Sequence, residues 1–181
     1  KVRQIIDKKD INSKDKLRFI KGDLRNKDWL DNIFLEYLKS KKPISSVIHF
    51  AGLKSIESSI KDPLQYWDTN IAITLSLLSI MQKYNCFKII FSSSASVYKI
   101  KGSSFLKESD LLEPTNPYGK TKFTIENILE DLFESDSKNE WKIANLRYFN
   151  PAGAHESGLL GENPKFQSLN LFPSIIRSIN G

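Results

Sequence analysis

The sequence has 181 residues, of which 40% are hydrophobic and 27% are charged, and its formal net charge is +6. This composition is typical of a folded globular protein and excludes a disordered chain, and no stretch approaches the roughly 20 consecutive apolar residues of a membrane span. One cysteine and two histidines exclude a disulfide framework, argue against a structural zinc site and agree with a reducing, cytoplasmic location.

The excess of positive charge raises the question of a nucleic-acid partner. Lysines of the first 42 residues are interleaved with acidic residues, and the only tight basic cluster runs from Lys39 to Lys42. That cluster lies just before Pro43, at the expected end of a helix, where charged side chains usually face solvent. We therefore expect no nucleic-acid partner, no bound metal and no membrane segment.

Short apolar runs alternate along the chain with stretches in which apolar residues recur at helical spacing. The expected strands are Leu17 to Ile20, Val47 to Ala51, Phe87 to Phe91 and Trp141 to Tyr148. The expected helices are Asn26 to Lys39, Pro63 to Tyr84, Tyr118 to Phe133 and a last one near Pro173. Loops are expected at Ser92 to Ser96 and over 149–170. Four strands with helices between them predict an α/β fold with a doubly wound parallel sheet, which binds ligands at the carboxyl ends of its strands.

One pair of residues points to chemistry. Tyr118 and Lys122 are four residues apart at the start of an expected helix, so their side chains share one face. A nearby cation stabilises a phenolate and lowers the pKa of a tyrosine, which lets the phenol accept and donate a proton near neutral pH. Ser94 follows a central strand, where its hydroxyl can hydrogen-bond a substrate oxygen. Such pairs also occur by chance on surface helices, and serines in loops, Ser92 among them, often only satisfy backbone groups.

Several longer motifs agree in order and spacing. They are SSSASVY from Ser92, YGKTK from Tyr118, HFAGLKSIESS from His49, RYFNPAGAHESG from Arg147, and GENP from Gly161 leading into LNLFPSI. Together they resemble the extended short-chain dehydrogenase/reductases and, within these, the UDP-glucose 4-epimerase family, over the chain from Asp23 to Ile175. The resemblance implies a Rossmann-like fold that binds NAD and a UDP-sugar. It also implies the reaction, in which transient hydride transfer at sugar C4 interconverts UDP-galactose and UDP-glucose.

The resemblance assigns roles to individual residues. It implies that Tyr118 is the catalytic base, that Lys122 binds the nicotinamide ribose and tunes the tyrosine, and that Ser94 hydrogen-bonds the reacting sugar hydroxyl. The implied cofactor-binding residues are Asp23, Leu24, Phe50, Ala51, Gly52, Lys54, Asn70, Ser92, Tyr118, Lys122 and Tyr148. The implied substrate-binding residues are Ser94, Tyr118, Phe149, Asn150, Asn170 and Leu171.

Two positions favour epimerisation over elimination. The resemblance extends to sugar-nucleotide 4,6-dehydratases, which carry an Asp-Glu pair directly after the hydroxyl residue, whereas this sequence has Ala95 and Ser96 there. Neither side chain titrates near neutral pH.

The sequence also departs from the epimerase pattern, with Lys99 in place of the usual glycine and Leu169 in place of a common asparagine. An epimerase of another UDP-sugar, an N-acetylhexosamine or a uronic acid, and a non-catalytic NAD-binding fold therefore stay open as alternatives.

The resemblance also implies segments that are not among these 181 residues. The family's first strand, its glycine-rich turn and its first helix would precede Lys1, and the eight glycines present form no such cluster. We therefore expect a fragment of a homodimeric parent protein. It would comprise part of an NAD-binding domain at 1–148 and the start of a substrate-binding region at 149–181, without most of the C-terminal substrate domain. We expect this fragment alone neither to bind NAD tightly nor to turn over a UDP-sugar.

Overall fold

The computed structural model describes residues 17–99, 105–161 and 171–180, and its contacts divide the chain into two compact units. The first unit, Gly22–Phe149, contains the sheet, and we name it the sheet unit. The second unit consists of Lys1–Lys21 and Asn150–Gly181.

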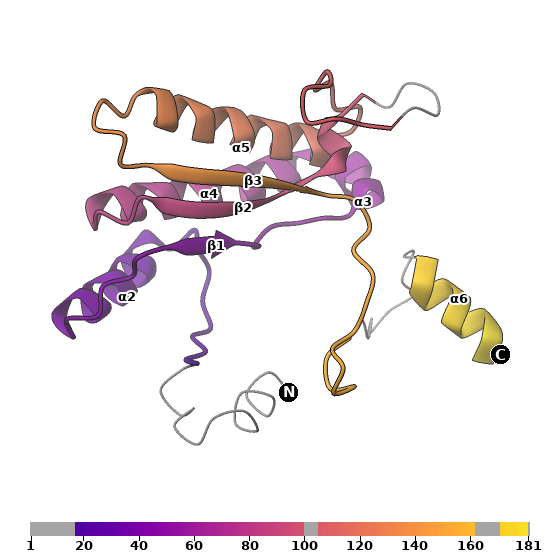
Figure 1. Ribbon diagram of the computed structural model, residues 1–181, viewed down its shortest axis with the longest axis horizontal. Coiled ribbons are helices and arrows are strands. Elements are labelled where there is room, and N and C mark those ends of the chain that lie inside the picture. Colours follow the sequence, from indigo (N-terminus) through magenta and orange to yellow (C-terminus); the bar gives the residue numbers. More distant parts are fainter. Residues whose placement is uncertain (1–16, 100–104, 162–170, 181) are drawn as a thin grey trace. The chain divides into compact units, whose positions relative to one another are not determined.

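A parallel three-stranded sheet forms the centre of the sheet unit (Figure 1). Its strands are β1 (Val47–His49), β2 (Lys88–Ser94) and β3 (Lys142–Tyr148), in the order β1-β2-β3. Ile48 pairs with Ile90 across the first ladder, and Ser94 pairs with Tyr148 at the end of the second. Because the strands are parallel, their carboxyl ends lie at one edge, which we name the carboxyl edge. The predicted α/β fold with a parallel sheet is confirmed.

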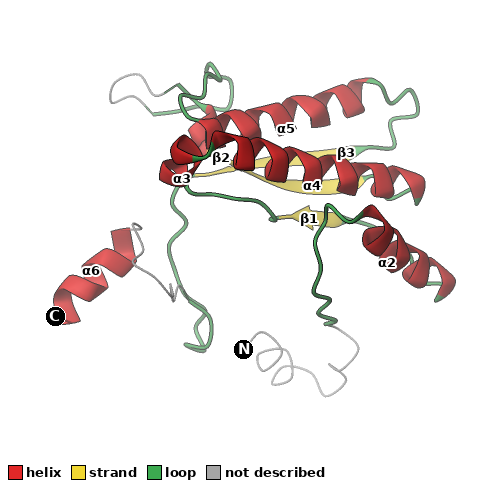
Figure 2. Cartoon of the chain, turned by 180° about the vertical axis from the view of Figure 1, so that it is seen from behind, coloured by secondary structure: helices red, strands yellow, loops and turns green. Residues whose placement is uncertain are grey.

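Helices cover one face of this sheet. The helices of the sheet unit are α2 (Lys27–Lys39), α3 (Ile56–Lys61), α4 (Pro63–Lys83) and α5 (Pro117–Glu134). Figure 2, which views the molecule from behind, shows α4 and α5 in front of the sheet, running roughly along its strands. The side chains at the centre of the core are Met81, Ile89, Phe91, Ile125 and Leu129, which are completely or almost completely buried between these layers. Removal of this apolar surface from water is the main force that holds the helices on the sheet.

Each long helix begins at a side chain that caps it. Asn26 accepts a hydrogen bond from the backbone N–H of Trp29 and so satisfies one of the free donors of α2. Asp62 and Asn116 do the same for α4 and α5, and each is followed by a proline in the first turn, where a missing N–H costs nothing. These local signals explain why the predicted bounds of the three helices differ by no more than one residue at either end.

Three predictions about the elements are wrong. Leu17–Ile20 has no regular structure, although its apolar composition predicts a strand. The expected loop at Ser92–Ser96 is largely ordered: β2 continues through Ser94 because β3 supplies backbone partners as far as Tyr148, whatever the side chains. The sheet therefore has three strands among the described residues where four were predicted.

The second unit contains helix α6 (Leu171–Asn180), which confirms the predicted helix near Pro173. The rest of its described residues are irregular, with a turn in which Gly158 adopts a positive φ of 67°. Across the described residues of both units, no helix is long and apolar enough to cross a membrane. No group of three or more His, Cys, Asp or Glu residues in the same part of the chain could hold a metal ion.

Candidate active site

The carboxyl edge gathers many of the residues that the sequence singles out. Ser92 and Ser94 lie in β2, Tyr148 ends β3, and Phe50, Ala51 and Gly52 follow β1. The start of α5 reaches the same edge because Gly119 has no side chain: a Cβ atom there would lie 2.4 Å from the carbonyl oxygen of Ser96. Helix α5 can therefore begin directly against the short 3₁₀ turn Ala95–Val97 that follows β2.

The three residues expected to act in catalysis lie together. Tyr118 and Lys122 are on the buried face of α5, and the Ser94 side chain is close enough to the Tyr118 phenol to favour its ionised form. The Nζ atom of Lys122 donates to the carbonyl oxygen of Ser92 over 2.9 Å and lies 5.9 Å from the centre of the Tyr118 ring. A phenol, a hydroxyl and an ammonium group thus occupy one small, buried volume at the end of the central strand.

The pKa of Tyr118 is raised above its usual value of 10.0, whereas the sequence predicts a lowered one. Burial disfavours the phenolate and is the largest cause; the hydrogen bond with Ser94 acts in the opposite direction, and the charge of nearby Tyr66 raises the pKa further. Burial also lowers the pKa of Lys122 from 10.5 to about 8. The chain as it stands therefore holds a protonated phenol beside a weakly hydrated ammonium group at neutral pH.

A backbone cradle lies beside this ammonium group. Gly52 has a φ of +148°, and a Cβ atom there would lie 3.1 Å from Oδ1 of Asn70 and 3.8 Å from Nζ of Lys122. Asn70 fixes the loop: its Oδ1 accepts from the N–H of Leu53 at 2.8 Å, and its Nδ2 donates to the carbonyl of Leu53 at 3.2 Å and to Thr121 Oγ1 at 3.0 Å. The segment after β1 is thus joined to α4 and α5 through one buried amide.

Asp23 and Leu24, the expected adenine-contacting pair, precede α2. The Asp23 carboxylate accepts from both Nε and Nη2 of Arg25, and the ion pair lowers the pKa of Asp23 to about 2. Arg25 also reaches Asp68 on α4 at 3.5 Å. The carboxylate is therefore ionised at neutral pH and held in one orientation.

The structure gives few contacts for the remaining predicted residues. The ring of Phe50 lies 6.5 Å from that of Tyr148, so both flank the carboxyl edge. Lys54 and Phe149 are exposed. Asn150 and Leu171 belong to the second unit and are described only within it, whereas Asn170 lies outside the described residues.

Sequence reasoning missed two sets of buried polar residues. Glu126 on α5 forms an ion pair with Arg147 on β3, with Nη2 of Arg147 2.7 Å from Oε2 of Glu126. His49 Nε2 lies 3.0 Å from Thr74 Oγ1, deep under the helices. One local signal for Glu126 exists, because it lies eight residues after Tyr118 and hence on the same helical face. Nothing local signals its pairing with Arg147.

Comparisons with known proteins identify the family. The sequence model of the NAD dependent epimerase/dehydratase family matches residues 3–181. The chain belongs to this family.

The relatives within the family are epimerases of nucleotide sugars. UDP-glucose 4-epimerase of Bacillus subtilis is 46% identical over 167 residues, which span 92% of this chain and 47% of the relative. A Pisum sativum relative, named bifunctional UDP-glucose 4-epimerase and UDP-xylose 4-epimerase 1, is 44% identical over 175 residues, or 97% of this chain and 47% of its own. The chain thus spans about half the length of the curated relatives that it matches.

A solved structure agrees with this assignment. UDP-glucose 4-epimerase from Bifidobacterium longum, in complex with NAD+ and UDP, is 43% identical with a TM-score of 0.78, and the match covers 90% of this chain and 47% of that one. The two residues after Ser94 are Ala95 and Ser96, neither of which titrates near neutral pH, and Ser94 Oγ accepts from the Ser96 N–H at 3.2 Å.

Proposed function

We propose that this chain carries the catalytic residues of an NAD-dependent UDP-glucose 4-epimerase, an isomerase that inverts the configuration at C4 of a UDP-hexose. The observation that carries the proposal is the meeting of Tyr118, Lys122 and Ser94 at the carboxyl edge. These residues come from a strand and a helix that are far apart in sequence. Identity of 44–46% to named epimerases supports the same reaction.

The chain's own groups would divide the chemistry among them. The phenol of Tyr118 would take the proton of the sugar 4-hydroxyl and later return it, while the Ser94 hydroxyl hydrogen-bonds the same oxygen and holds it in place. The ammonium group of Lys122 favours the phenolate while the proton is away, since an opposite charge in a buried site acts strongly. NAD, when bound, supplies the acceptor for the C4 hydride and gives it back to the opposite face of the 4-keto sugar.

The residues present fit the ribose and nicotinamide half of NAD. Gly52 exposes its backbone beside the Asn70 amide and the Lys122 ammonium group, which supplies close approach, a hydrogen-bonding group and a positive charge at one place. We assign to the cofactor Asp23 and Leu24 at the adenine, Phe50, Ala51, Gly52, Lys54 and Asn70 along the dinucleotide, and Ser92, Tyr118, Lys122 and Tyr148 at the nicotinamide end. We assign Ser94, Tyr118, Phe149, Asn150, Asn170 and Leu171 to the UDP-sugar.

The proposal also covers the domain organisation, the oligomeric state and the cellular location of the protein. Residues 1–148 would form part of the NAD-binding domain and residues 149–181 the beginning of the substrate-binding region. The whole protein would act as a cytoplasmic homodimer. The absence of a carboxylic acid and carboxylate directly after Ser94 favours epimerisation over the elimination of water, which needs an added acid and base.

A chimaera tests the reaction. Residues 23–175 would replace the equivalent stretch of the Bacillus subtilis UDP-glucose 4-epimerase, which is 46% identical to this chain. We expect the chimaera to convert UDP-galactose to UDP-glucose, and Tyr118→Phe to lower the rate by about 10²–10⁴-fold, the usual contribution of a positioned acid–base group. Tyr84→Phe is the matched control, because the Tyr84 hydroxyl donates to the Asp31 carbonyl and Tyr84 caps the carboxyl end of α4, away from Tyr118.

Full activity in the Tyr118→Phe chimaera would exclude the proposed role of the phenol. A substrate panel of UDP-galactose, UDP-N-acetylgalactosamine, a UDP-uronic acid and UDP-xylose, followed by NMR, measures which sugar is preferred. UDP-xylose belongs in the panel because the pea relative is named for both activities. Turnover by the 181-residue chain alone would contradict our expectation that it is inactive.

A further inference from the structure

Helix α5 presents three buried functional side chains at intervals of four residues. Tyr118, Lys122 and Glu126 lie on the same face, and each is at most 9% exposed. Because helical side chains lean toward the N-terminus, all three reach toward the carboxyl end of β2. Lys122 donates to the Ser92 carbonyl, Glu126 accepts from the Ser93 hydroxyl, and the Tyr118 phenol is influenced by the neighbouring Ser94 side chain.

The Glu126 carboxylate is held from two sides. The Ser93 hydroxyl donates to its Oε1 from β2. Arg147 on β3 donates through Nε at 3.1 and 3.2 Å and through Nη2 at 2.7 Å, which is the fork geometry of a strong charge-assisted pair. The pair raises the pKa of Arg147 above its usual range, so the guanidinium group stays charged.

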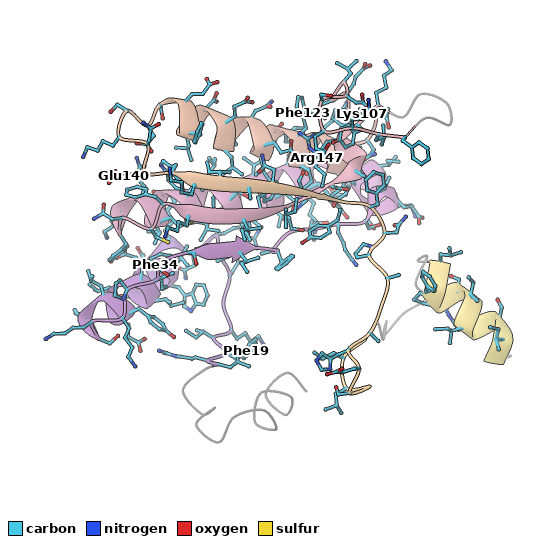
Figure 3. All side chains as sticks on the ribbon, viewed as in Figure 1. Phe19, Phe34, Lys107, Phe123, Glu140 and Arg147 are labelled. Atoms are coloured by element: carbon cyan, nitrogen blue, oxygen red, sulfur yellow. The ribbon has the colours of Figure 1, made fainter. Side chains whose placement is uncertain are left out.

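Arg147 extends the cluster to the segment between β2 and α5. Its Nη1 atom donates to the Tyr98 hydroxyl at 2.7 Å and to the carbonyl oxygen of Glu108 at 3.1 Å. Its guanidinium group also lies 4.9 Å from the centre of the Tyr98 ring. In Figure 3 Arg147 lies on β3 in the same region as Lys107, which agrees with the contact to Glu108. One ion pair thus joins β2, β3, α5 and the connection that leads into α5.

A buried ion pair is a poor way to gain stability, because removing both charges from water costs about as much as their attraction returns. A buried pair with fixed geometry can instead select one arrangement of the elements that it joins. Here those elements are the ones that carry Ser94 and Tyr118. A slip of α5 by one residue, roughly 1.5 Å along its axis, would move the Tyr118 phenol away from the Ser94 side chain.

We propose that Glu126 and Arg147 are positioning residues, which fix α5 against β2 in the register that keeps the Tyr118 phenol beside Ser94. The inference rests on the proposed function for its importance to turnover. The geometry that it predicts can be measured in the 181-residue chain without any turnover. An inactive chimaera would therefore contradict the proposed function, whereas the positioning role is tested separately by the measured geometry.

The experiment is a titration of Tyr118 in the 181-residue chain, labelled with ¹³C at the ζ carbon of its six tyrosines. Tyr118→Phe identifies the resonance by its loss. Glu126→Gln removes a negative charge from α5, which alone would lower the pKa of Tyr118. Separation of the phenol from the Ser94 side chain would raise it, so the two effects differ in sign. We expect the measured pKa to rise by about 0.5 in Glu126→Gln.

Ser93→Ala is the second variant, because it breaks the link to β2 while the charges of Glu126 and Arg147 stay. It keeps the test decisive if Glu126→Gln does not fold, and we expect the same rise. Ser76→Ala is the matched control: this serine is buried in α4 and lies outside the cluster. A Tyr118 pKa that stays unchanged or falls in Ser93→Ala, or that rises equally in Ser76→Ala, overturns the proposal.

Discussion

The Nζ atom of Lys122 donates a hydrogen bond to the carbonyl oxygen of Ser92 and lies 4.7 Å from the centre of the Phe91 ring. The carbonyl and the electron-rich face of the ring both stabilise a cation. They offset part of the cost of burial, which lowers the pKa of Lys122 to about 8 but leaves the amine charged at neutral pH. The positive charge beside Tyr118 is therefore a fixed feature of the site.

Replacing Lys122 by Met should remove this charge at nearly constant volume. In the chimaera we expect Lys122→Met to lower the rate of UDP-galactose conversion by at least about 10²-fold, since the phenolate loses its counter-charge. Lys120→Met is the matched control, because Lys120 belongs to the same YGKTK motif but faces solvent. Equal activity of the two variants would show that the charge at position 122 does not assist the phenol.

Asn70 should be the residue on which the segment after β1 depends most. Its side chain makes hydrogen bonds to both backbone groups of Leu53 and to Thr121, and Asn70→Ala leaves these groups without that partner. We expect a loss of about 3 kcal/mol in the free energy of unfolding, measured with urea. We also expect faster hydrogen exchange at the Leu53 amide.

Asn127→Ala is the control for this variant. Asn127 is exposed on α5, so its replacement should change the free energy of unfolding by no more than about 0.5 kcal/mol. If Leu53 exchanges at the same rate in Asn70→Ala and in the unchanged chain, the amide does not hold the loop.

Elements with strong local signals were predictable from the sequence. The amphipathic spacing of α2 and α4, with Asn26 as a cap and Pro63 in a first turn, gave bounds within one residue of the observed ones. Helix α3 was missed because its six residues are too few to show a period. Leu17–Ile20 has the composition of a strand, but a strand also needs a neighbour, and no local pattern reports one.

The candidate site was also only partly predictable from the sequence. Tyr118, Lys122 and Ser94 were found because each lies in a recognisable motif, and the structure places them together. The Glu126–Arg147 pair joins residues 21 positions apart through the packing of α5 on β3, and only the three-dimensional arrangement reveals such a pairing. The direction of the Tyr118 pKa shift was also beyond the sequence, because it depends on how deeply the phenol is buried.

Gly119→Ala tests how closely α5 approaches the turn after β2. Alanine is favoured over glycine by about 1 kcal/mol within a helix, which alone would stabilise the chain. The added Cβ atom, however, would lie 2.4 Å from the carbonyl oxygen of Ser96, a backbone atom that cannot rotate away. Overpacking of this kind costs about 1–3 kcal/mol, so we expect a net loss of stability in urea unfolding.

The same substitution should disturb the site, since Ser96 is hydrogen-bonded to Ser94. Lys120→Ala provides the comparison: it changes the next residue of α5, whose side chain is exposed. We expect the Tyr118 ¹³C resonance to shift in Gly119→Ala and to stay in place in Lys120→Ala. A stabilised Gly119→Ala chain would mean that α5 and the turn are not in contact.

His49 is a buried imidazole, and its hydrogen bonds indicate which ring nitrogen carries the proton. Thr74 Oγ1 uses its one proton to donate to the carbonyl of Asn70 at 2.8 Å. It must therefore accept from His49 Nε2, which carries the ring proton. Two effects lower the pKa of His49 from 6.5 to about 4: burial is the larger one, and the charge of Lys122 is the smaller one. His49 is thus neutral in the folded chain over the physiological range.

This buried imidazole predicts how stability depends on pH. Between pH 6.5 and about 4 the unfolded chain binds a proton at His49 that the folded chain does not, so the free energy of unfolding falls as the pH falls through this window. The slope is about 1.4 kcal/mol per pH unit, which gives a loss of about 2 kcal/mol between pH 7 and pH 5. Urea titrations at the two pH values measure it. His49→Gln keeps a donor toward Thr74 without a titratable ring, so most of this difference should vanish, and an unchanged difference in His49→Gln would assign the pH dependence to other groups.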